Sequence, residues 1–136
     1  KLGNTKQEIR DYDKAIEINP QDANAYYNRG ITYGKLGNFN QAINDFDKAI
    51  ELNPQYAKAY NNRGIAYGKL GNTKQEIRDY DKAIEINPQD ANAYYNRGIT
   101  YGKLGNFNQA RNDMKIAARL GDETAQDILR ELEIAW

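Results

Sequence analysis

Apolar and small residues recur along this chain at steps of three and four, the spacing that places side chains on one face of an α-helix. The apolar and small positions of residues 23–36 are Tyr26, Gly30, Tyr33 and Leu36. Those of the segment that follows are Phe39, Ala42, Ile43, Phe46, Ala49 and Ile50. Large and small side chains alternate in both sets, which predicts an all-α protein whose helices approach one another closely.

Proline and glycine mark the ends of the predicted helices. Proline cannot continue a helix and biases the preceding residue away from helical conformation. The prolines that follow apolar segments are Pro20, Pro54 and Pro88. A glycine in the left-handed conformation commonly closes a helix, and the glycines of the Lys-Leu-Gly sequences that follow predicted first helices are Gly37, Gly71 and Gly105. Each unit therefore contains two helices, joined by a turn so short that they pack antiparallel.

Residues that can cap helices follow these stops. Asp22 and Asp90 stand just before Ala-rich segments, where a carboxylate can accept hydrogen bonds from exposed backbone amides. The sequence Asn-x-x-Gln after each Lys-Leu-Gly resembles a capping box, and its asparagines are Asn38, Asn72 and Asn106.

The two-helix pattern is repeated along the chain. Residues 1–42 are identical to residues 69–110, and residues 35–68 match most of residues 1–34. A period of about 34 residues is typical of solenoid proteins, in which each unit contacts only its neighbours. Identity over so long a stretch indicates either a recent duplication or an engineered array.

Residues 1–120 resemble the tetratricopeptide repeat family in period, two-helix unit, small-residue positions and closing proline. The tryptophan that is usual in this family is replaced by Tyr26, Tyr60 and Tyr94. The usual leucine before the helix glycine is replaced by Arg29, Arg63 and Arg97. The resemblance implies a right-handed superhelical solenoid of antiparallel helix pairs.

In the phase of that family the chain divides into a half repeat, three repeats and a cap within a single domain. Residues 1–22 hold only a second helix, expected at about 4–18. The full repeats are 23–56, 57–90 and 91–124. Residues 125–136 are expected to form a capping helix, with an apolar stripe made of Ala125, Ile128, Leu129, Leu132 and Trp136.

Composition excludes several functions. Nineteen basic residues balance 19 acidic ones over the 136 residues, so no net charge recruits nucleic acid or an anionic membrane. The chain has no cysteine and no histidine, which removes disulfides, most zinc sites and the usual general base. Only 40% of residues are hydrophobic, no apolar run is long enough to span a membrane, and no signal peptide is visible. We expect no cofactor, no metal, no membrane partner and, by default, a cytoplasmic protein.

Pairs of aspartates spaced by two are a recurrent acidic motif. They are Asp11 with Asp13, Asp45 with Asp47, and Asp79 with Asp81. Residues two apart point to different faces of a helix and do not form a carboxylate dyad. We interpret them as solvated surface residues and predict that the chain is not an enzyme.

A carboxylate also occurs at a position of close helix contact. Glu76 stands where another unit has Ala42. Because burying an unpaired charge costs stability, Glu76 is expected to reach solvent or to pair with Arg63 or Arg97.

The family resemblance assigns peptide binding to a stripe of each first helix, lining a concave groove. The stripe residues are Asn24, Tyr27, Asn28, Ile31 and Lys35, then Lys58, Asn61, Asn62 and Ile65, then Asn92, Tyr95, Asn96 and Ile99. Amides can hold a peptide backbone, lysine attracts a carboxylate, and tyrosine and isoleucine offer apolar anchors. The carboxylate clamp of chaperone adaptors is only partly present. The prediction is a non-catalytic scaffold that binds a protein or peptide segment.

Two alternatives remain open at this stage. The lone first helix leaves apolar residues without a neighbour, so the chain is expected to self-associate weakly through its N-terminal half repeat, as a dimer or a head-to-tail stack. The residues assigned to this contact are Ile9, Tyr12, Ile16, Leu132 and Trp136. RNA binding through stacked tyrosines is less favoured, because the charge is balanced.

Overall fold

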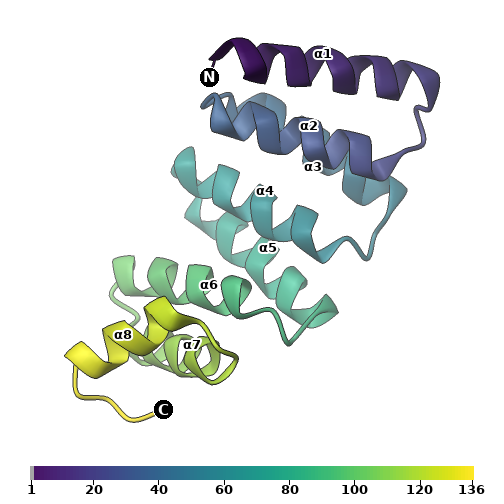
Figure 1. The fold of residues 1–136 in the computed structure, drawn as a ribbon. Helices are drawn as coiled ribbons and strands as arrows, with labels where there is room; N and C mark the ends of the chain where they lie inside the picture. Colours follow the sequence, from purple (N-terminus) through teal and green to yellow (C-terminus); the bar gives the residue numbers. More distant parts are fainter. Residues whose placement is uncertain (1) are drawn as a thin grey trace. The chain divides into compact units, whose positions relative to one another are not determined.

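A computed structural model describes residues 2–136, and in this part of the chain the secondary structure is entirely helical (Figure 1). The helices are α1 (Leu2–Ile18), α2 (Ala23–Lys35), α3 (Phe39–Leu52), α4 (Ala57–Lys69), α5 (Thr73–Ile86), α6 (Ala91–Lys103), α7 (Phe107–Arg119) and α8 (Glu123–Glu131). The prediction of an all-α protein is confirmed. None of these helices combines the length and apolar character needed to cross a membrane.

The chain forms two compact units, residues 1–79 and residues 80–136, which divide within α5. In the first unit α2 packs against both α1 and α3, and α3 packs against α4. In the second unit α7 packs against α6 and α8. Within each unit, consecutive helices therefore form the antiparallel pairs that the short turns require.

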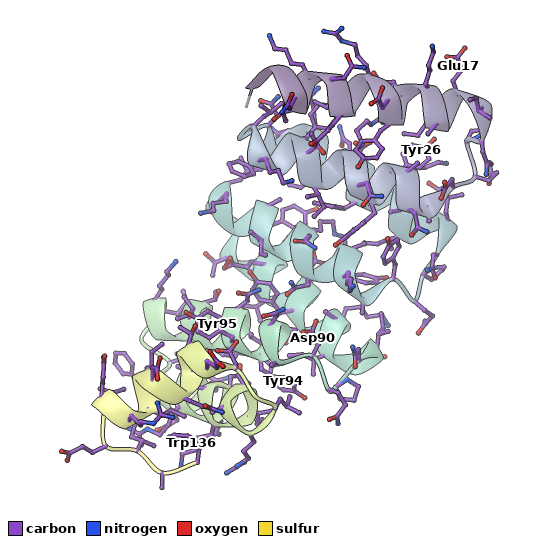
Figure 2. All side chains as sticks on the ribbon, viewed as in Figure 1. Glu17, Tyr26, Asp90, Tyr94, Tyr95 and Trp136 are labelled. Carbon is purple, nitrogen blue, oxygen red and sulfur yellow. The ribbon has the colours of Figure 1, made fainter. Side chains whose placement is uncertain are left out.

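The helix ends confirm most of the signals in the sequence. Gly37, Gly71 and Gly105 have φ values of 77°, 79° and 78°, the left-handed conformation that glycine adopts without strain. Asp22 accepts a hydrogen bond from the Asn24 backbone amide at 3.0 Å, and Asp90 caps α6 in the same way (Figure 2). The expected capping boxes are wrong at two positions, because Asn38 and Asn106 make no side-chain cap bond.

Identical sequences adopt different structures at the start of α1 and before α5. Residues 2–4 are helical, whereas the same three residues at 70–72 form the turn that follows α4. That turn is closed by a hydrogen bond from the Asn72 amide to the Tyr67 carbonyl at 2.9 Å. Because α4 supplies the carbonyl, the turn depends on the helix before it. Helix α1 starts at Leu2, earlier than the expected residue 4.

The C-terminal segment differs from the expected helix over residues 125–136. Helix α8 ends at Glu131, and Glu133 has a φ of 56°. The Ile134 amide then bonds back to the Leu129 carbonyl at 2.8 Å. The chain turns here, and the Arg130 guanidinium lies 5.6 Å from the centre of the Trp136 ring (Figure 2). The cation–π contact fixes a short return segment where the periodicity alone predicted further helix.

Small residues occupy the closest helix contacts. Ala42, Ala49 and Ala59 are fully buried. At Gly30 an added Cβ would lie 2.8 Å from Phe46 Cε1. The alternation of small and large side chains thus lets α2 and α3 approach closely while the ring of Phe46 fills the space beside them.

Candidate binding surface

Tyr27 belongs to a network of four side chains on the first unit. Its ring stacks on that of Tyr56, with centroids 4.8 Å apart and an interplanar angle of 29°. Asn62 Nδ2 donates a hydrogen bond to the Tyr27 hydroxyl oxygen at 3.0 Å. The Tyr56 hydroxyl donates one to Asn24 Oδ1 at 2.8 Å. These bonds join α2, α4 and the turn between α3 and α4 into one wall, which we call the Tyr27 wall.

Burial raises the pKa of both tyrosine hydroxyls of this wall. It raises the pKa of Tyr27, because an ionised phenolate would lose hydration, and this effect exceeds the opposing effect of the Asn62 bond. Burial also raises the pKa of Tyr56, and the nearby charge of Asp22 adds to it. The wall is therefore neutral and polar at physiological pH.

Tyr56 was not among the residues that the sequence assigned to binding. It stands one repeat after Asp22 and one repeat before Asp90, at a position where both aspartates cap a helix. Tyr56 precedes α4 without making a side-chain cap bond. The sequence signal for Tyr56 is this departure from the repeat, because an aromatic residue stands where the other repeats have a capping aspartate. Its ring stacks on Tyr27.

The asparagines of the second repeat differ from the expected peptide-binding arrangement. Asn61 is only 8% exposed, so it is not part of the candidate binding surface. Asn62 Nδ2 is already bonded to the Tyr27 hydroxyl and to the Lys58 carbonyl at 2.9 Å. By contrast, the side chains of Asn28, Lys35 and Lys58 are exposed. Lysines and the Tyr27 wall, rather than a row of free amides, define this surface.

A cavity of about 490 Å³ lies among α2, α3 and α4 beside that wall. Its apolar lining comes from Ile31, Phe39, Ala42, Phe46, Ile65 and Ala66, and its polar lining from Lys35, Asn62 and Lys69. Both lysines are exposed, and no ion pair involves them within residues 2–136. The cavity thus combines an apolar interior with two positive charges that no described acidic residue neutralises.

The next helix pair replaces apolar surface with a carboxylate. Glu76 of α5 stands where α3 has Ala42, one repeat earlier. Its carboxylate lies directly against Gly68, in the space that a side chain at that position would need. Of the two expected outcomes, Glu76 is half-exposed and so reaches solvent in part, while Arg63 binds Asp47 and Asp79 rather than Glu76. The surface of α4 and α5 is therefore negative where that of α2 and α3 is apolar.

The second unit contains a cavity of its own. Tyr95 and Ile99 are half-buried and pack against the core formed around Tyr94 and Met114 (Figure 2), while Asn92 is exposed and Asn96 half-exposed. A cavity of about 310 Å³ lies among α6, α7 and α8. Its lining includes Ile99, Phe107, Met114, Ile128 and Leu132, with Arg111 as the charged residue. Among the described residues, no lysine pair lines this second cavity.

The residues assigned to self-association belong to two different units. Ile9, Tyr12 and Ile16 are half-exposed on α1. Leu132 is 62% exposed and lines the cavity of the second unit. Trp136 is 38% exposed and covered in part by Arg130.

Comparison with protein families identifies the repeat. A tetratricopeptide repeat model matches residues 23–56 and 57–90. Two further models of the same repeat match residues 79–112 and 1–37. The chain is a tetratricopeptide repeat protein.

Solved structures agree with this assignment. The crystal structure of MamA superposes with a TM-score of 0.82 at 29% identity, covering 92% of this chain and 73% of that one. TTC0263 from Thermus thermophilus gives a TM-score of 0.78 at 28% identity, and the match covers 89% of this chain and 68% of that one. The first repeat domain of Spaghetti (RPAP3), bound to the HSP90 peptide SRMEEVD, gives a TM-score of 0.76 at 25% identity. The match covers 83% of this chain and 91% of that one. The fold is a tetratricopeptide repeat solenoid, and the comparison with curated protein sequences found no match.

This tetratricopeptide repeat protein departs from its family in a repeated ion-pair arrangement. Arg29 Nε and Nη2 donate to the two carboxylate oxygens of Asp45 at 2.8 and 2.7 Å. Arg29 Nη1 donates to Asp13 at 2.8 Å. Each arginine thus binds one aspartate that follows it in the sequence and another that precedes it at the same separation. The same three bonds recur around Arg63 with Asp79 and Asp47, and around Arg97 with Asp113 and Asp81.

The interpretation of the paired aspartates as solvated surface is wrong for Asp45 and Asp79, which are buried, whereas Asp11, Asp13, Asp47 and Asp81 are exposed. Asp45, Asp79 and Asp113 are 5%, 4% and 3% exposed. In the Asp45/Asp47 and Asp79/Asp81 pairs the first aspartate binds the arginine of its own repeat, and the second binds the arginine of the next repeat. The two aspartates of these pairs do point to different faces, as expected, and each binds a different arginine.

Aromatic rings and burial complete the arrangement. The guanidinium of Arg63 lies 5.4 Å from the centre of the Tyr60 ring and 5.9 Å from that of Tyr67, and the other two arginines have equivalent tyrosines. The hydrogen bonds that Arg63 donates to Asp79 raise the pKa of Arg63, so it stays charged. Burial raises the pKa of Asp79, and the bonds from Arg63 oppose that shift. Arginine replaces the usual leucine here because the site around it is acidic and aromatic.

Proposed function

We propose that this chain is a non-catalytic interaction scaffold that binds an extended peptide on the surface of α2, α3 and α4. An apolar side chain of the peptide enters the 490 Å³ cavity, and an adjacent acidic group contacts Lys35 and Lys69. The lysine-rimmed cavity is the observation that carries the proposal.

The size and lining of the cavity suit this ligand. Ligand sites are typically concave and mostly apolar, with a few polar groups that set orientation, and have volumes of about 300–1,000 Å³. Ile31, Phe46 and Ile65 supply the apolar contacts. An ammonium group without an acidic partner attracts a carboxylate, and the interaction strengthens near a low-dielectric wall. An acidic peptide with an apolar anchor satisfies both requirements.

One structural neighbour supports the ligand class. The RPAP3 domain holds a peptide, SRMEEVD, whose sequence combines acidic residues with methionine and valine. The comparison is by fold, at 25% identity, so it supports a peptide of this character and names no partner.

The groups available for catalysis favour the same conclusion. The chain has no histidine or cysteine, and the most buried aspartates are bonded to arginines. Charge-assisted bidentate bonds of this kind hold carboxylates in place and keep them from acting as bases.

Selection from a random peptide library on the full chain tests the proposal. We expect the selected peptides to share an acidic residue beside a leucine, methionine or phenylalanine. Their affinity for the Lys35→Ala/Lys69→Ala variant should fall about tenfold, and the loss should shrink at high salt, because exposed charges are screened. Isothermal titration calorimetry measures both effects.

A matched variant controls for the loss of two positive charges. Lys48 and Lys82 are bonded to Glu51 and Glu85 along their own helices, so the Lys48→Ala/Lys82→Ala variant should bind the peptides as the parent chain does. Selected peptides without acidic residues, or equal affinity for both double variants, would contradict the proposal.

A further inference from the structure

The hydrogen bonds of the Tyr27 wall leave one donor and one acceptor unused. Asn62 Nδ2 donates to the Lys58 carbonyl at 2.9 Å and to the Tyr27 hydroxyl oxygen at 3.0 Å. A backbone carbonyl only accepts, so the bond to Lys58 fixes which atom of the Asn62 amide is the nitrogen, and both of its hydrogens are used. Within residues 2–136, Asn62 Oδ1 accepts no hydrogen bond and the Tyr27 hydroxyl donates none.

This unused pair lies at the edge of the 490 Å³ cavity. Asn62 lines the cavity, and the Tyr27 hydroxyl is in contact with the Asn62 amide. Both residues are half-buried. In the part of the chain that the structure describes, no buried side-chain nitrogen or oxygen lacks a hydrogen-bond partner, so Asn62 Oδ1 is open to solvent. A molecule in the cavity can reach it.

The surrounding contacts hold both side chains in place. The Tyr27 ring stacks on Tyr56, whose own hydroxyl donates to Asn24 Oδ1 at 2.8 Å. The Asn62 amide is tied to a carbonyl of its own helix. Side chains that are already ordered lose little rotamer freedom when a ligand binds. The donor and the acceptor are therefore preorganised.

We propose that Tyr27 and Asn62 together bind one backbone residue of the extended peptide. The Tyr27 hydroxyl donates to the peptide C=O, and Asn62 Oδ1 accepts the peptide N–H. A residue of an extended chain can direct its N–H and its C=O to the same neighbour, as in the hydrogen-bonded pairs of an antiparallel sheet. This inference rests on the proposed function, since the cavity and the two lysines hold the side chains of the same peptide.

A carboxylate fits this pair less well than an amide. It offers acceptors only, and the Asn62 nitrogen has no hydrogen left to donate to it. The partial negative charge of Asn62 Oδ1 would also repel it. The acidic group of the ligand is thus directed to Lys35 and Lys69, while the wall takes an amide. The two sites together set the register of the peptide.

The second unit does not repeat this pair. Tyr95 stands two repeats after Tyr27, but the residue two repeats after Asn62 is Arg130. Arg130 bonds Asp127 at 2.6 Å and lies against the Trp136 ring. The substitution removes the amide acceptor, so the backbone contact is assigned to the first unit alone.

Ester scanning of a bound peptide tests the proposal on the full chain. The probe is the tightest-binding peptide from the library selection, resynthesised with an ester oxygen in place of each backbone N–H in turn. One of these esters should bind the parent chain about tenfold more weakly than the amide, because it lacks the N–H that Asn62 Oδ1 accepts. The same ester should show no such loss with Asn62→Ala, as in a double-mutant cycle. Tyr27→Phe should weaken the all-amide peptide about fivefold to tenfold. Isothermal titration calorimetry gives the dissociation constants.

Two control variants separate this contact from its surroundings. Tyr33 also belongs to α2, but its ring lies 5.9 Å from the Arg29 guanidinium and does not line the cavity. Tyr33→Phe should therefore bind every peptide as the parent chain does. The Lys35→Ala/Lys69→Ala variant should weaken the amide and ester peptides by the same factor. Circular dichroism checks that each variant keeps its helicity.

Several results would overturn the proposal. Equal affinity of all the esters, an ester loss that persists in Asn62→Ala, or full affinity of Tyr27→Phe would remove the backbone contact. If the lysine variant still lost affinity, the proposed function would stand without it. Competition by polyuridine RNA would assign the pair to a nucleobase, since the uracil edge carries the same donor and acceptor. A library that yields no binding peptide would overturn both proposals.

Discussion

Glycine at two positions of α2 has opposite roles. At Gly30 an added Cβ would lie 2.8 Å from Phe46 Cε1 and 3.2 Å from Asp45 Cβ, both in the core. At Gly34 it would meet nothing within 4 Å. Gly30 permits a close helix approach, whereas Gly34 leaves open space at the cavity. Packing requires a glycine only at position 30.

Alanine substitutions at these two glycines should change stability in opposite directions. Gly30→Ala forces Phe46 to shift and should lower the free energy of unfolding by about 1–3 kcal/mol, the usual cost of overpacking. Gly34→Ala should raise it by about 0.5–1 kcal/mol, because alanine loses less backbone entropy in a helix. Urea denaturation measures both, and each variant serves as the control for the other. A stability loss at Gly34 would show that the cavity wall is tighter than the structure indicates.

Single residues also show which contacts could be predicted from the sequence and which could not. The need for a small residue at Gly30 could be predicted, because helical periodicity determines which positions share a face. The partner of Asp45 could not, because it is an arginine that lies on another helix. Tyr56 was missed for a similar reason, since its ring position depends on the path of a turn.

At the scale of helices, each arginine binds both the helix before its own and the helix after it. Arg63 of α4 binds Asp79 of α5 and Asp47 of α3, and Arg29 of α2 likewise binds α1 and α3. Breaking a buried pair by removing one partner costs more than replacing both, because an unpaired carboxylate stays desolvated.

Arg63→Leu restores the usual family residue and should nevertheless destabilise the protein by about 2 kcal/mol, because buried Asp79 loses two charge-assisted bonds. Adding Asp79→Ala should recover part of that loss. Thermal and urea unfolding of the two single variants and the double variant give the coupling energy. A single Arg63→Leu variant as stable as the parent would show that the ion pair adds no stability over an apolar contact.

Helix boundaries were the most predictable feature at this scale. Proline and glycine fix the stops locally, so most helices end close to the expected positions. Helix α8 is the exception, because a contact between Arg130 and Trp136 turns the chain back after Glu131. Tertiary contacts of this kind leave no periodic signal in the sequence.

Across the whole molecule, tyrosines are the groups whose ionisation is most clearly tied to folding. Burial is the first cause that raises the pKa of Tyr27, Tyr56, Tyr67 and Tyr101 above the ordinary value of 10.0. The arginines beside them stay charged, because their pKa values are raised as well.

Stability should therefore fall in alkaline solution. The unfolded chain ionises its tyrosines near pH 10.0, whereas the folded chain holds these four protonated to higher pH. The contribution of these tyrosines to stability is complete below the tyrosine pKa of the unfolded chain. It is lost as pH rises through the higher tyrosine pKa values of the folded chain. Urea unfolding at increasing pH and absorbance titration of tyrosinate measure the effect. Flat stability through this range, with all tyrosines titrating together, would contradict it.

Each arginine reaches one aspartate ahead of it and one behind it at equal separation, which makes a repeat unit complementary to its own copy. A unit carries an arginine for the aspartate before it and an aspartate for the arginine after it. A duplicated segment inserted between two existing units therefore meets compatible charges at both joints without any compensating mutation. Residues 1–42 and 69–110 are identical over such a segment. Lengthening the array by copying its own gene segment needs no new interface to evolve.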